Sequence, residues 1–456
     1  MPRRHQHVAV LVVPAPRNSW PSFCLGLAAF FGLLAAVPPA AAEDWPQWRG
    51  ANRDGLWRET GIVDQFESEE IAIRWRATVS NGYSGPTVAN GRVYVTDFVH
   101  RPERQERLLA FDFEDGSFLW SHSWPADYGR ISFPNGPRAS VTIAGSRAYA
   151  LGAVGRLVCC DAATGAVLWC RDMAGDFAVH MPTRGLAAAP LVEGDLVIVQ
   201  VGGTPEACLV ALDKVTGEVR WTALEDHASY SAPTIIEQAG RRVLVCWTAA
   251  RVAGLDPATG ELLWDHPFIP HRLIDQIITP VVHEDYLFVS SFSAGSLMLR
   301  LLPDRLAVEP VWRRMGANER QTDSLHVLMG NPAFFDGGLF GVDSFGQFRG
   351  LDVETGDRLW EDTTVTSQVR WGSAHMVMQG NRAWIFNDTG ELIIAHLSRE
   401  GYEEISRARL IAPTRGQLDR RGGVTWAHPA FSHRHVLVRN DRELVSASLA
   451  APEDTP

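Results

Sequence analysis

The chain has 456 residues, of which 46% are hydrophobic and 21% are charged, so it can bury a large core and is neither disordered nor fibrous in composition. Its formal net charge of −11 at pH 7 argues against nucleic acid or an anionic lipid surface as a partner, because both repel an acidic protein. Length alone allows two or three domains.

The first 42 residues have the pattern of a secretory signal peptide. Arg3 and Arg4 precede an apolar run over residues 23–37, and small residues follow it up to Ala42. A positively charged start, a short apolar run and a small-residue end are typical of a signal that is cleaved, here after Ala42. A retained membrane anchor is the alternative, although the run is short for one. We therefore expect an exported chain, in the periplasm or on the extracellular side of a bacterial envelope, with no transmembrane segment after cleavage.

Residues 43–70 form a second segment, which we expect to be an arm with little regular structure. It carries Trp45, Trp48 and Trp57 among Gly, Pro and Asn residues that favour turns. Because an indole ring has a large apolar surface, the arm is expected to lay these rings on the main body.

One pattern returns along the chain after residue 70. The stretch 211–221 shows it best, with Ala211, an Asp-x-x-Thr-Gly corner at 213–217 and Trp221. An aspartate can fold its carboxylate back onto the N–H groups of a turn, and glycine supplies the positive φ that closes it. The pattern therefore predicts a β-hairpin whose returning strand ends in a tryptophan.

The repeated aspartates and tryptophans are predicted to be structural rather than catalytic. A carboxylate at a hairpin corner is held by the turn, and an indole suits a wedge between packed sheets. These predicted docking residues are Asp112, Trp120, Asp161, Trp169, Asp213, Trp221, Asp256, Trp264, Trp312, Asp352 and Trp360.

A second signal opens each unit and occurs eight times. It is a small residue, usually followed by Pro, then two apolar runs separated by a polar turn, as in residues 85–95. Two opening and two closing strands give a four-stranded antiparallel sheet roughly every 50 residues, a period typical of β-propellers.

The two ends of the chain predict how the array closes. The last unit, residues 428–449, lacks a fourth strand, and residues 71–77 supply one. Pairing them closes a ring and covers the sheet edges. The sequence thus predicts an all-β, eight-bladed β-propeller over residues 71–449, closed by an N-terminal strand that pairs with the last blade and followed by a tail at 450–456.

The Ala-x-Asp-x-x-Thr-Gly-x-x-x-Trp units resemble the tryptophan-docking repeats of the pyrroloquinoline-quinone (PQQ) type propellers. The W-P-Q-W-R-G motif at 45–50 and the G-Y-S-G-P motif at 82–86 are similar to secreted members often grouped with the BamB-type outer-membrane assembly propeller. The resemblance implies the fold. It leaves the function open, because the superfamily contains both quinoprotein dehydrogenases and non-enzymatic scaffolds.

Candidate site residues lie in the loops that precede the eight opening strands, because these loops lead to the central channel of a propeller. They are Tyr83, Arg138, His180, Arg184, His227, Tyr230, His271, Asp275, Gln276, His326, Asn331, Arg370, Trp371, His375, Trp426 and His428. Such groups could hold a flat anionic molecule or a peptide loop. The alternative is a polar ring that hydrogen-bonds itself around channel water.

The resemblance also implies what a quinoprotein dehydrogenase would need: Ca²⁺ held by Glu, Asn and Asp oxygens, an Asp base and a Trp beneath the quinone. Asp275, Asn331, Trp371 and Trp426 could be cast in those roles, but no glutamate of the loops is a convincing calcium ligand.

The cysteines are expected to be small buried apolar residues on strands. Five remain after residue 42, a poor number for a disulfide framework, and their spacing matches no metal motif. Cys159 and Cys160 are adjacent on a predicted strand, so their side chains should point to opposite faces and should not form a disulfide.

These features favour an exported, non-enzymatic propeller that acts as a protein-binding scaffold in the cell envelope. We expect a monomer with an envelope protein as partner, no cofactor and no bound metal. The first alternative is a PQQ- and Ca²⁺-dependent alcohol or sugar dehydrogenase. The second is a small-molecule or glycan binding module that uses the channel aromatics Tyr83, Tyr230, Trp371 and Trp426.

Overall fold

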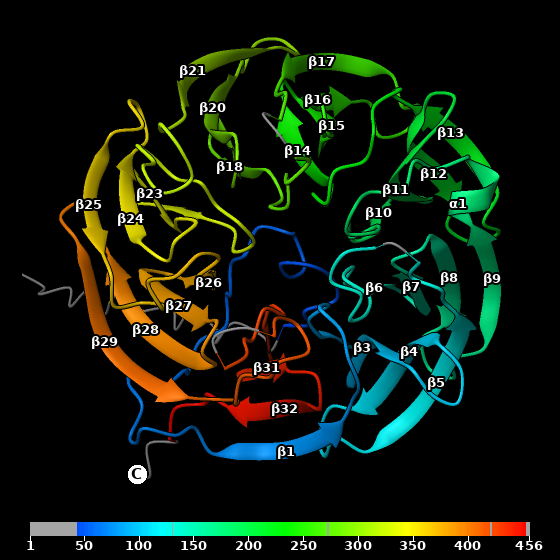
Figure 1. The fold of residues 1–456 in the computed structure, drawn as a ribbon, viewed down its shortest axis with the longest axis horizontal. Coiled ribbons are helices and arrows are strands. Elements are labelled where there is room, and N and C mark those ends of the chain that lie inside the picture. Colours follow the sequence, from blue (N-terminus) through cyan, green and yellow to red (C-terminus); the bar gives the residue numbers. More distant parts are fainter. Residues whose placement is uncertain (1–42, 130, 271–272, 420–421, 453–456) are drawn as a thin grey trace, which may run out of the picture. The chain divides into compact units, whose positions relative to one another are not determined.

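The computed structural model describes residues 43–129, 131–270, 273–419 and 422–452, which all belong to one compact unit. The predicted signal peptide, its cleavage site at Ala42 and His271 lie outside the described residues. Within the described residues, eight four-stranded antiparallel sheets surround a central axis (Figure 1), which confirms the predicted eight-bladed propeller.

The first four blades follow the order of the chain, each from its innermost to its outermost strand. Blade 1 contains β2 (Thr87–Ala89), β3 (Arg92–Val99), β4 (Gln105–Asp112) and β5 (Phe118–Pro125). Blade 2 contains β6 (Thr142–Ala144), β7 (Arg147–Leu151), β8 (Arg156–Asp161) and β9 (Val167–Asp172). Blade 3 contains β10 (Leu191–Glu193), β11 (Leu196–Gly203), β12 (Ala207–Asp213) and β13 (Val219–Ala223). Blade 4 contains β14 (Thr234–Gln238), β15 (Arg241–Trp247), β16 (Arg251–Leu255) and β17 (Leu262–Pro267).

The remaining blades continue around the ring. Blade 5 contains β18 (Val281–His283), β19 (Tyr286–Ser291), β20 (Gly295–Leu301) and β21 (Val308–Arg314). Blade 6 contains β22 (Ala333–Phe335), β23 (Gly338–Val342), β24 (Phe348–Asp352) and β25 (Arg358–Asp362). Blade 7 contains β26 (Ala374–Gln379), β27 (Arg382–Asn387), β28 (Glu391–Leu397) and β29 (Tyr402–Arg409). Blade 8 contains β30 (Ala430–Ser432), β31 (His435–Arg439), β32 (Glu443–Ser448) and β1 (Ile73–Thr78).

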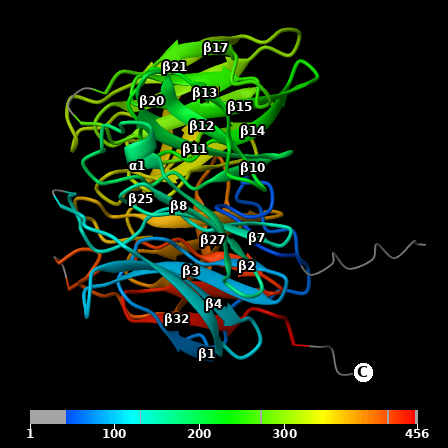
Figure 2. The same ribbon diagram turned by 90° about the vertical axis from the view of Figure 1, so that its right-hand side faces the viewer.

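Blade 8 is the closure of the ring. Its outermost strand is β1, which pairs antiparallel with β32 in a register that sets Trp75 opposite Ser446 and Thr78 opposite Glu443. Figures 1 and 2 show β1 (blue) beside β32 (red), two strands from opposite ends of the described chain. The predicted closure is confirmed, with the strand at 73–78 rather than 71–77.

The Asp-x-x-Thr-Gly corners are tight turns between the third and fourth strands. In blade 3, Asp213 Oδ1 accepts the backbone N–H groups of Val215 and Thr216 at 2.8 and 2.9 Å, and Gly217 has a φ of +74°. The Arg220 guanidinium donates to Asp213 Oδ2 at 2.6 Å and holds the pKa of this carboxyl well below its usual range. The aspartate therefore serves the turn.

In the described chain, five outer-strand tryptophans pack on the glycine corner of the next blade, whereas Trp360 Nε1 donates to the carbonyl of Ser398 at 2.9 Å in a blade where a Cβ added at Gly401 would have no neighbour within 4 Å. A Cβ added at Gly260 would come within 2.7 Å of the Trp221 ring, and Trp221 Nε1 donates to the carbonyl of Pro257 at 3.2 Å. The same ring-over-glycine contact joins Trp75 to Gly116, Trp120 to Gly165, Trp169 to Gly217 and Trp312 to Gly356. A side chain at these glycines would occupy the place of the indole.

Trp264 is an exception with a local cause. The corner of blade 5, residues 302–307, lacks the Thr-Gly pair. Trp264 Nε1 instead donates to Gln238 Oε1 of its own blade at 2.8 Å, and Gln238 Nε2 donates to the carbonyl of Ala307 at 2.7 Å. Gln238 thus links the Trp264 indole to the corner of blade 5, which this indole does not contact through a glycine as those five tryptophans do.

The N-terminal arm enters the channel, whereas the sequence predicted only that it lies on the main body. Trp45 exchanges backbone hydrogen bonds with Val88 of β2 at 2.9 and 2.8 Å, and buried Arg53 donates to the carbonyls of Pro190 and Pro233. Burial lowers the pKa of Arg53 to about 9. Figure 1 shows this blue segment crossing the middle of the ring. The arm therefore fills part of the channel along the innermost strands.

The described chain contains a single-turn helix, α1 (Met173–Asp176), which was not predicted. It begins where Asp172 Oδ1 accepts the N–H of Gly175 at 3.2 Å. None of the helices in the described ranges is long and apolar enough to cross a bilayer.

The cysteines follow the expectation with one exception. Cys159 and Cys160 are free, buried and belong to different apolar clusters, so they lie on opposite faces of β8. Cys208 and Cys246 are also buried and free. Cys170 is exposed, contrary to the expected burial, because it lies on the outermost strand β9.

The wedge can be tested with substitutions on both sides of one contact. Trp221→Ala should lower the free energy of unfolding by about 3–5 kcal/mol, because it leaves a cavity between blades 3 and 4. Gly260→Ala should also destabilise, since its φ is +77° and the new Cβ meets the ring. Leu262→Ala, at an exposed position of β17, should change stability by no more than about 0.5 kcal/mol. Urea unfolding measures all three, and a loss below 1 kcal/mol for Trp221→Ala would contradict the wedge.

Candidate functional site

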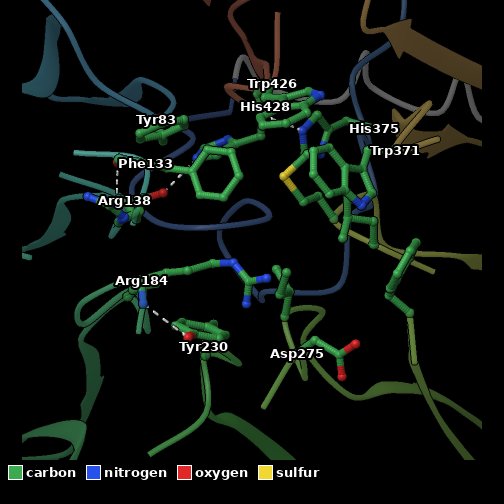
Figure 3. A pocket seen from close by; sticks show the side chains of 18 of the residues that line it. Tyr83, Phe133, Arg138, Arg184, Tyr230, Asp275, Trp371, His375, Trp426 and His428 are labelled. Atoms are coloured by element: carbon green, nitrogen blue, oxygen red, sulfur yellow. Dashed lines mark hydrogen bonds between the residues drawn. The ribbon is translucent and has the colours of Figure 1, made fainter. Parts of the chain in front are cut away.

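A cavity of about 210 Å³ lies on the axis, and every loop that connects one blade to the next contributes to its wall. Trp48 of the arm also lines it, so the arm forms part of the cavity's inner boundary. Figure 3 shows the labelled side chains gathered around this central space. The fold thus brings together residues that are distant in sequence, such as Phe133 and Trp371, whose ring centroids are 6.1 Å apart.

Many of the candidate loop residues meet at this cavity. Those that line it are Tyr83, Arg138, Arg184, Tyr230, Asp275, Arg370, Trp371, His375, Trp426 and His428. The other candidates do not. His180 and His227 are exposed, and their rings contact each other at an interplanar angle of 38° with centroids 4.6 Å apart. Gln276 is buried and accepts the backbone N–H of Asp275 at 3.0 Å.

Two further candidates have structural contacts instead. His326 is buried, and its Nδ1 lies 3.0 Å from the carbonyl of Phe292. Asn331 donates to the carbonyl of Thr279 at 2.7 Å and lines a smaller neighbouring cavity of about 20 Å³, which also contacts the arm. Both residues therefore hold loops in place rather than face the large cavity.

Most of the apolar residues of the cavity wall were not predicted from the sequence. The cavity-lining residues that were not anticipated are Trp48, Phe133, Ser140, Ala187, Ala189, Ala232, Leu273, Ile277, Phe292, Leu328 and Met329. Most of them lie in the loops that connect one blade to the next, but the prediction considered only polar and aromatic residues near the opening strands. Trp48 and Phe292 could not be found by their position before an opening strand, since Trp48 belongs to the arm and Phe292 to the turn between β19 and β20. The wall is therefore more apolar than predicted.

Arg138 presents a guanidinium at the wall that is held by backbone carbonyls. It donates to Ser132 and Phe133 at 3.1 and 2.5 Å, and its guanidinium carbon lies 5.0 Å from the centroid of the Tyr83 ring. In the described ranges it forms no ion pair with a carboxylate. Burial lowers the pKa of Arg138 from its ordinary value.

Arg184 extends from the loop before β10 toward the middle of the cavity (Figure 3). It donates to the carbonyl of Ile274 at 3.3 Å, and its guanidinium carbon lies 5.5 Å from the centroid of the Tyr230 ring. The Tyr230 hydroxyl in turn accepts the backbone N–H of Arg184 at 3.2 Å. Most of the five N–H donors of this guanidinium are thus left for the cavity.

Arg370 differs from the other two arginines because its charge is compensated. It donates to Glu319 at 2.6 Å and lies over the rings of Trp371 and Phe292, at 4.8 and 5.4 Å from their centroids. This ion pair lies at the rim and keeps Arg370 stacked against the aromatic wall.

Asp275 is the single carboxyl group of the wall. The side chain is 2% exposed, its Oδ2 accepts the N–H of Ser293 at 2.7 Å, and its Oδ1 has no hydrogen-bond partner within the described chain. Burial raises the pKa of Asp275, against the lowering effects of Ser293 and, more weakly, of the Arg184 charge.

His428 and Ser140 form a close pair at the wall. The Pro429 carbonyl can only accept a hydrogen bond, so His428 Nδ1, 3.1 Å away, carries the hydrogen and donates it. The other ring nitrogen, Nε2, therefore accepts a hydrogen bond from the Ser140 hydroxyl at 2.6 Å. This is the geometry of a serine and its base. However, burial and the neighbouring His375 lower the pKa of His428 to about 3, so the imidazole has little tendency to take a proton. The pair is therefore suited to holding blades 2 and 8 together.

The wall does not offer the ligands that a quinone and calcium site requires. Calcium prefers six or more oxygen ligands, usually with several carboxylates, whereas this wall has Asp275 alone, and Asn331 faces the smaller cavity. Across the described residues no three His, Cys, Asp or Glu side chains gather in a way that could hold a metal ion. The donor set here does not fit such a cofactor.

Eight four-stranded blades around a loop-lined cavity, with tryptophan-over-glycine contacts at five of the junctions in the described chain, define a PQQ-type β-propeller. The family can be stated more closely. A family model described as outer membrane protein assembly factor BamB matches residues 65–137 and 130–326, more than half of the chain, so the chain belongs to this family.

Individual relatives are distant and belong to two kinds of protein. The outer membrane protein assembly factor BamB of Shewanella oneidensis is 24% identical over 271 residues, which are 54% of this chain and 60% of the relative. A quinoprotein ethanol dehydrogenase of Pseudomonas putida is 24% identical over 362 residues, 68% of this chain and 52% of the relative. The matches thus span about half to three fifths of each relative.

A solved structure shows the same fold. BamB from Moraxella catarrhalis superposes with a TM-score of 0.56 at 18% identity, over 83% of this chain and 97% of that chain. At this level of identity the likeness establishes the propeller architecture.

The buried imidazoles predict a pH dependence of stability. Because the pKa of His428 falls from 6.5 to about 3 on folding, the unfolded chain binds a proton below pH 6.5 that the folded chain does not. Stability is therefore highest above pH 6.5 and is lost as the pH falls toward 3. His428→Gln should reduce the loss between pH 7 and pH 5 by about 2 kcal/mol.

Chemical denaturation at each pH measures this difference. His100→Gln, at an exposed position, is the control and should leave the pH profile unchanged. Equal profiles for the wild type and His428→Gln would show that this imidazole is not kept neutral by the fold.

Proposed function

We propose that this chain is an exported, monomeric, non-enzymatic propeller that binds a protein partner in the bacterial cell envelope. Membership of the family described as outer membrane protein assembly factor BamB supports this function. The structural observation that carries it is an exposed apolar patch beside the mouth of the cavity, made of Ile269, Leu273 and Met315.

The patch has the properties of a docking surface. Its three side chains are 75%, 57% and 52% exposed and lie on two consecutive connecting loops, after β17 and after β21. The loops approach one another where the Arg313 guanidinium lies 4.5 Å from the centroid of the Phe268 ring. Gathered apolar side chains in water are unfavourable unless a partner covers them.

The partner we propose is a protein rather than a lipid surface or a nucleic acid. The net charge of −11 disfavours both of those. Beside these apolar side chains, the loop after β21 carries Arg320 and Glu319, and Glu319 pairs with Arg370 of the loop after β25. An apolar centre with a charged rim is the usual composition of a protein–protein interface.

We also propose that the chain works without a quinone cofactor, although it is similar to quinoprotein ethanol dehydrogenases. The proposal rests on the single carboxyl group of the cavity wall, which is too few for a calcium site of that kind. A dye-linked oxidation assay with added PQQ and Ca²⁺, using alcohols and sugars, should give no turnover above a heat-treated sample. Measured oxidation that depends on both additions would overturn this part.

The patch is tested by capture with matched variants. Tagged wild-type protein should recover one partner from envelope extract of the source bacterium in stoichiometric amount, identified by mass spectrometry. Ile269→Asp with Met315→Asp, which places two charges in the patch and leaves the cavity wall intact, should reduce recovery at least tenfold.

The control carries the same chemistry elsewhere. Phe118→Asp with Leu262→Asp changes two exposed apolar positions on the outer strands β5 and β17 and should leave recovery unchanged. Equal recovery by both double variants, with both folded by circular dichroism, would place the partner away from the patch.

A further inference from the structure

The central cavity has the size of a single-ring molecule. Its volume is about 210 Å³, and an apolar cavity of about 150 Å³ is already large enough for benzene. A ring with one short substituent therefore fits. Seven aromatic rings of the described wall, among them Phe133, Tyr230 and Trp371, offer faces and edges against which such a ring can pack.

Two arginines also bring positive charge to the cavity, and the carboxyl groups that act on them, Glu106 on Arg138 and Asp275 on Arg184, do so without forming an ion pair. Arg184 reaches its middle with most N–H donors unused, and Arg138 stands at the wall with its hydrogen bonds directed to backbone carbonyls. Neither forms an ion pair with a carboxylate of the described chain, and the wall's own Asp275 lies beyond ion-pair distance of both. Two partly buried guanidiniums without a direct ion-pair partner in the described chain favour an anion.

From these two properties we propose that the cavity binds a small organic carboxylate with one aromatic ring, without a metal ion. The ring packs among Phe133, Tyr230 and Trp371, and the carboxylate accepts N–H groups of the Arg184 guanidinium. A planar carboxylate matches the paired donors of a guanidinium, which adds orientation to the charge attraction. Arg138 adds a second positive charge.

The wall also indicates which molecules are rejected. A small anion without a ring leaves the aromatic faces unfilled, and a neutral ring leaves the Arg184 guanidinium without its counter-charge. Both halves of the ligand are therefore required. This binding site adjoins the apolar patch, since Leu273 belongs to both, but Ile269 and Met315 do not line the cavity.

Benzoate is the probe for the test, with acetate and benzyl alcohol as the two half-ligands. Isothermal titration calorimetry of the wild type should give saturable 1:1 binding of benzoate, at least tenfold tighter than either half-ligand and unaffected by EDTA. PQQ with and without Ca²⁺ is titrated in parallel and should bind no more tightly than benzoate.

Arg184→Gln should weaken benzoate binding at least tenfold, because it removes the charge and keeps most of the side-chain length. Arg104→Gln is the control, as this exposed arginine does not line the cavity, and it should change affinity less than threefold. Thermal unfolding of both variants verifies that they are folded.

Three results would overturn the proposal: no benzoate binding to folded wild type, equal binding of benzyl alcohol, or full affinity in Arg184→Gln. Tight binding of PQQ that requires Ca²⁺ would do the same. Since Ile269→Asp with Met315→Asp leaves the cavity wall intact, benzoate binding to that variant separates failure of this site from failure of the docking patch.

Discussion

The structure depends on one contact that recurs at five junctions of the described ring, an indole of an outer strand lying over the glycine corner of the next blade. At Trp221 and Gly260 the ring occupies the space that a side chain would need, so the corner must be glycine for packing as well as for its positive φ. This contact sets the spacing of neighbouring sheets. Repeated at these junctions, it bends a linear array of hairpins into a circle, and the pairing of β1 with β32 closes it.

Closure determines the chemistry available to the molecule, because the connecting loops meet only at the axis. There Trp48 of the arm lines a cavity with an aromatic wall. The Arg184 guanidinium extends into this cavity with most of its N–H donors unused. The buried imidazoles of His375 and His428 stay neutral and join loops from different blades. The result is a cavity on the axis next to exposed apolar side chains, and the proposed functions use these two surfaces.

The candidate site could be predicted in part. Arg138, Arg184 and Trp371 were found because each precedes an opening strand, and the propeller places such loops on the axis. His180 and His227 satisfy the same rule but contact each other at the surface, since a long loop can direct its side chains either way. Trp48 could not be placed at all, because nothing in an irregular arm specifies where it docks.

The sequence by itself determined the number of blades, the hairpin corners and the strand that closes the ring, because each follows from local turn chemistry and a regular alternation of apolar residues. Only the tertiary structure decided that the arm enters the channel and that the cavity wall is mainly apolar. It also determines that Arg184 has no ion-pair partner in the described chain, whereas Arg370 is paired with Glu319. These outcomes depend on contacts between residues far apart in the chain, and no local pattern specifies such contacts.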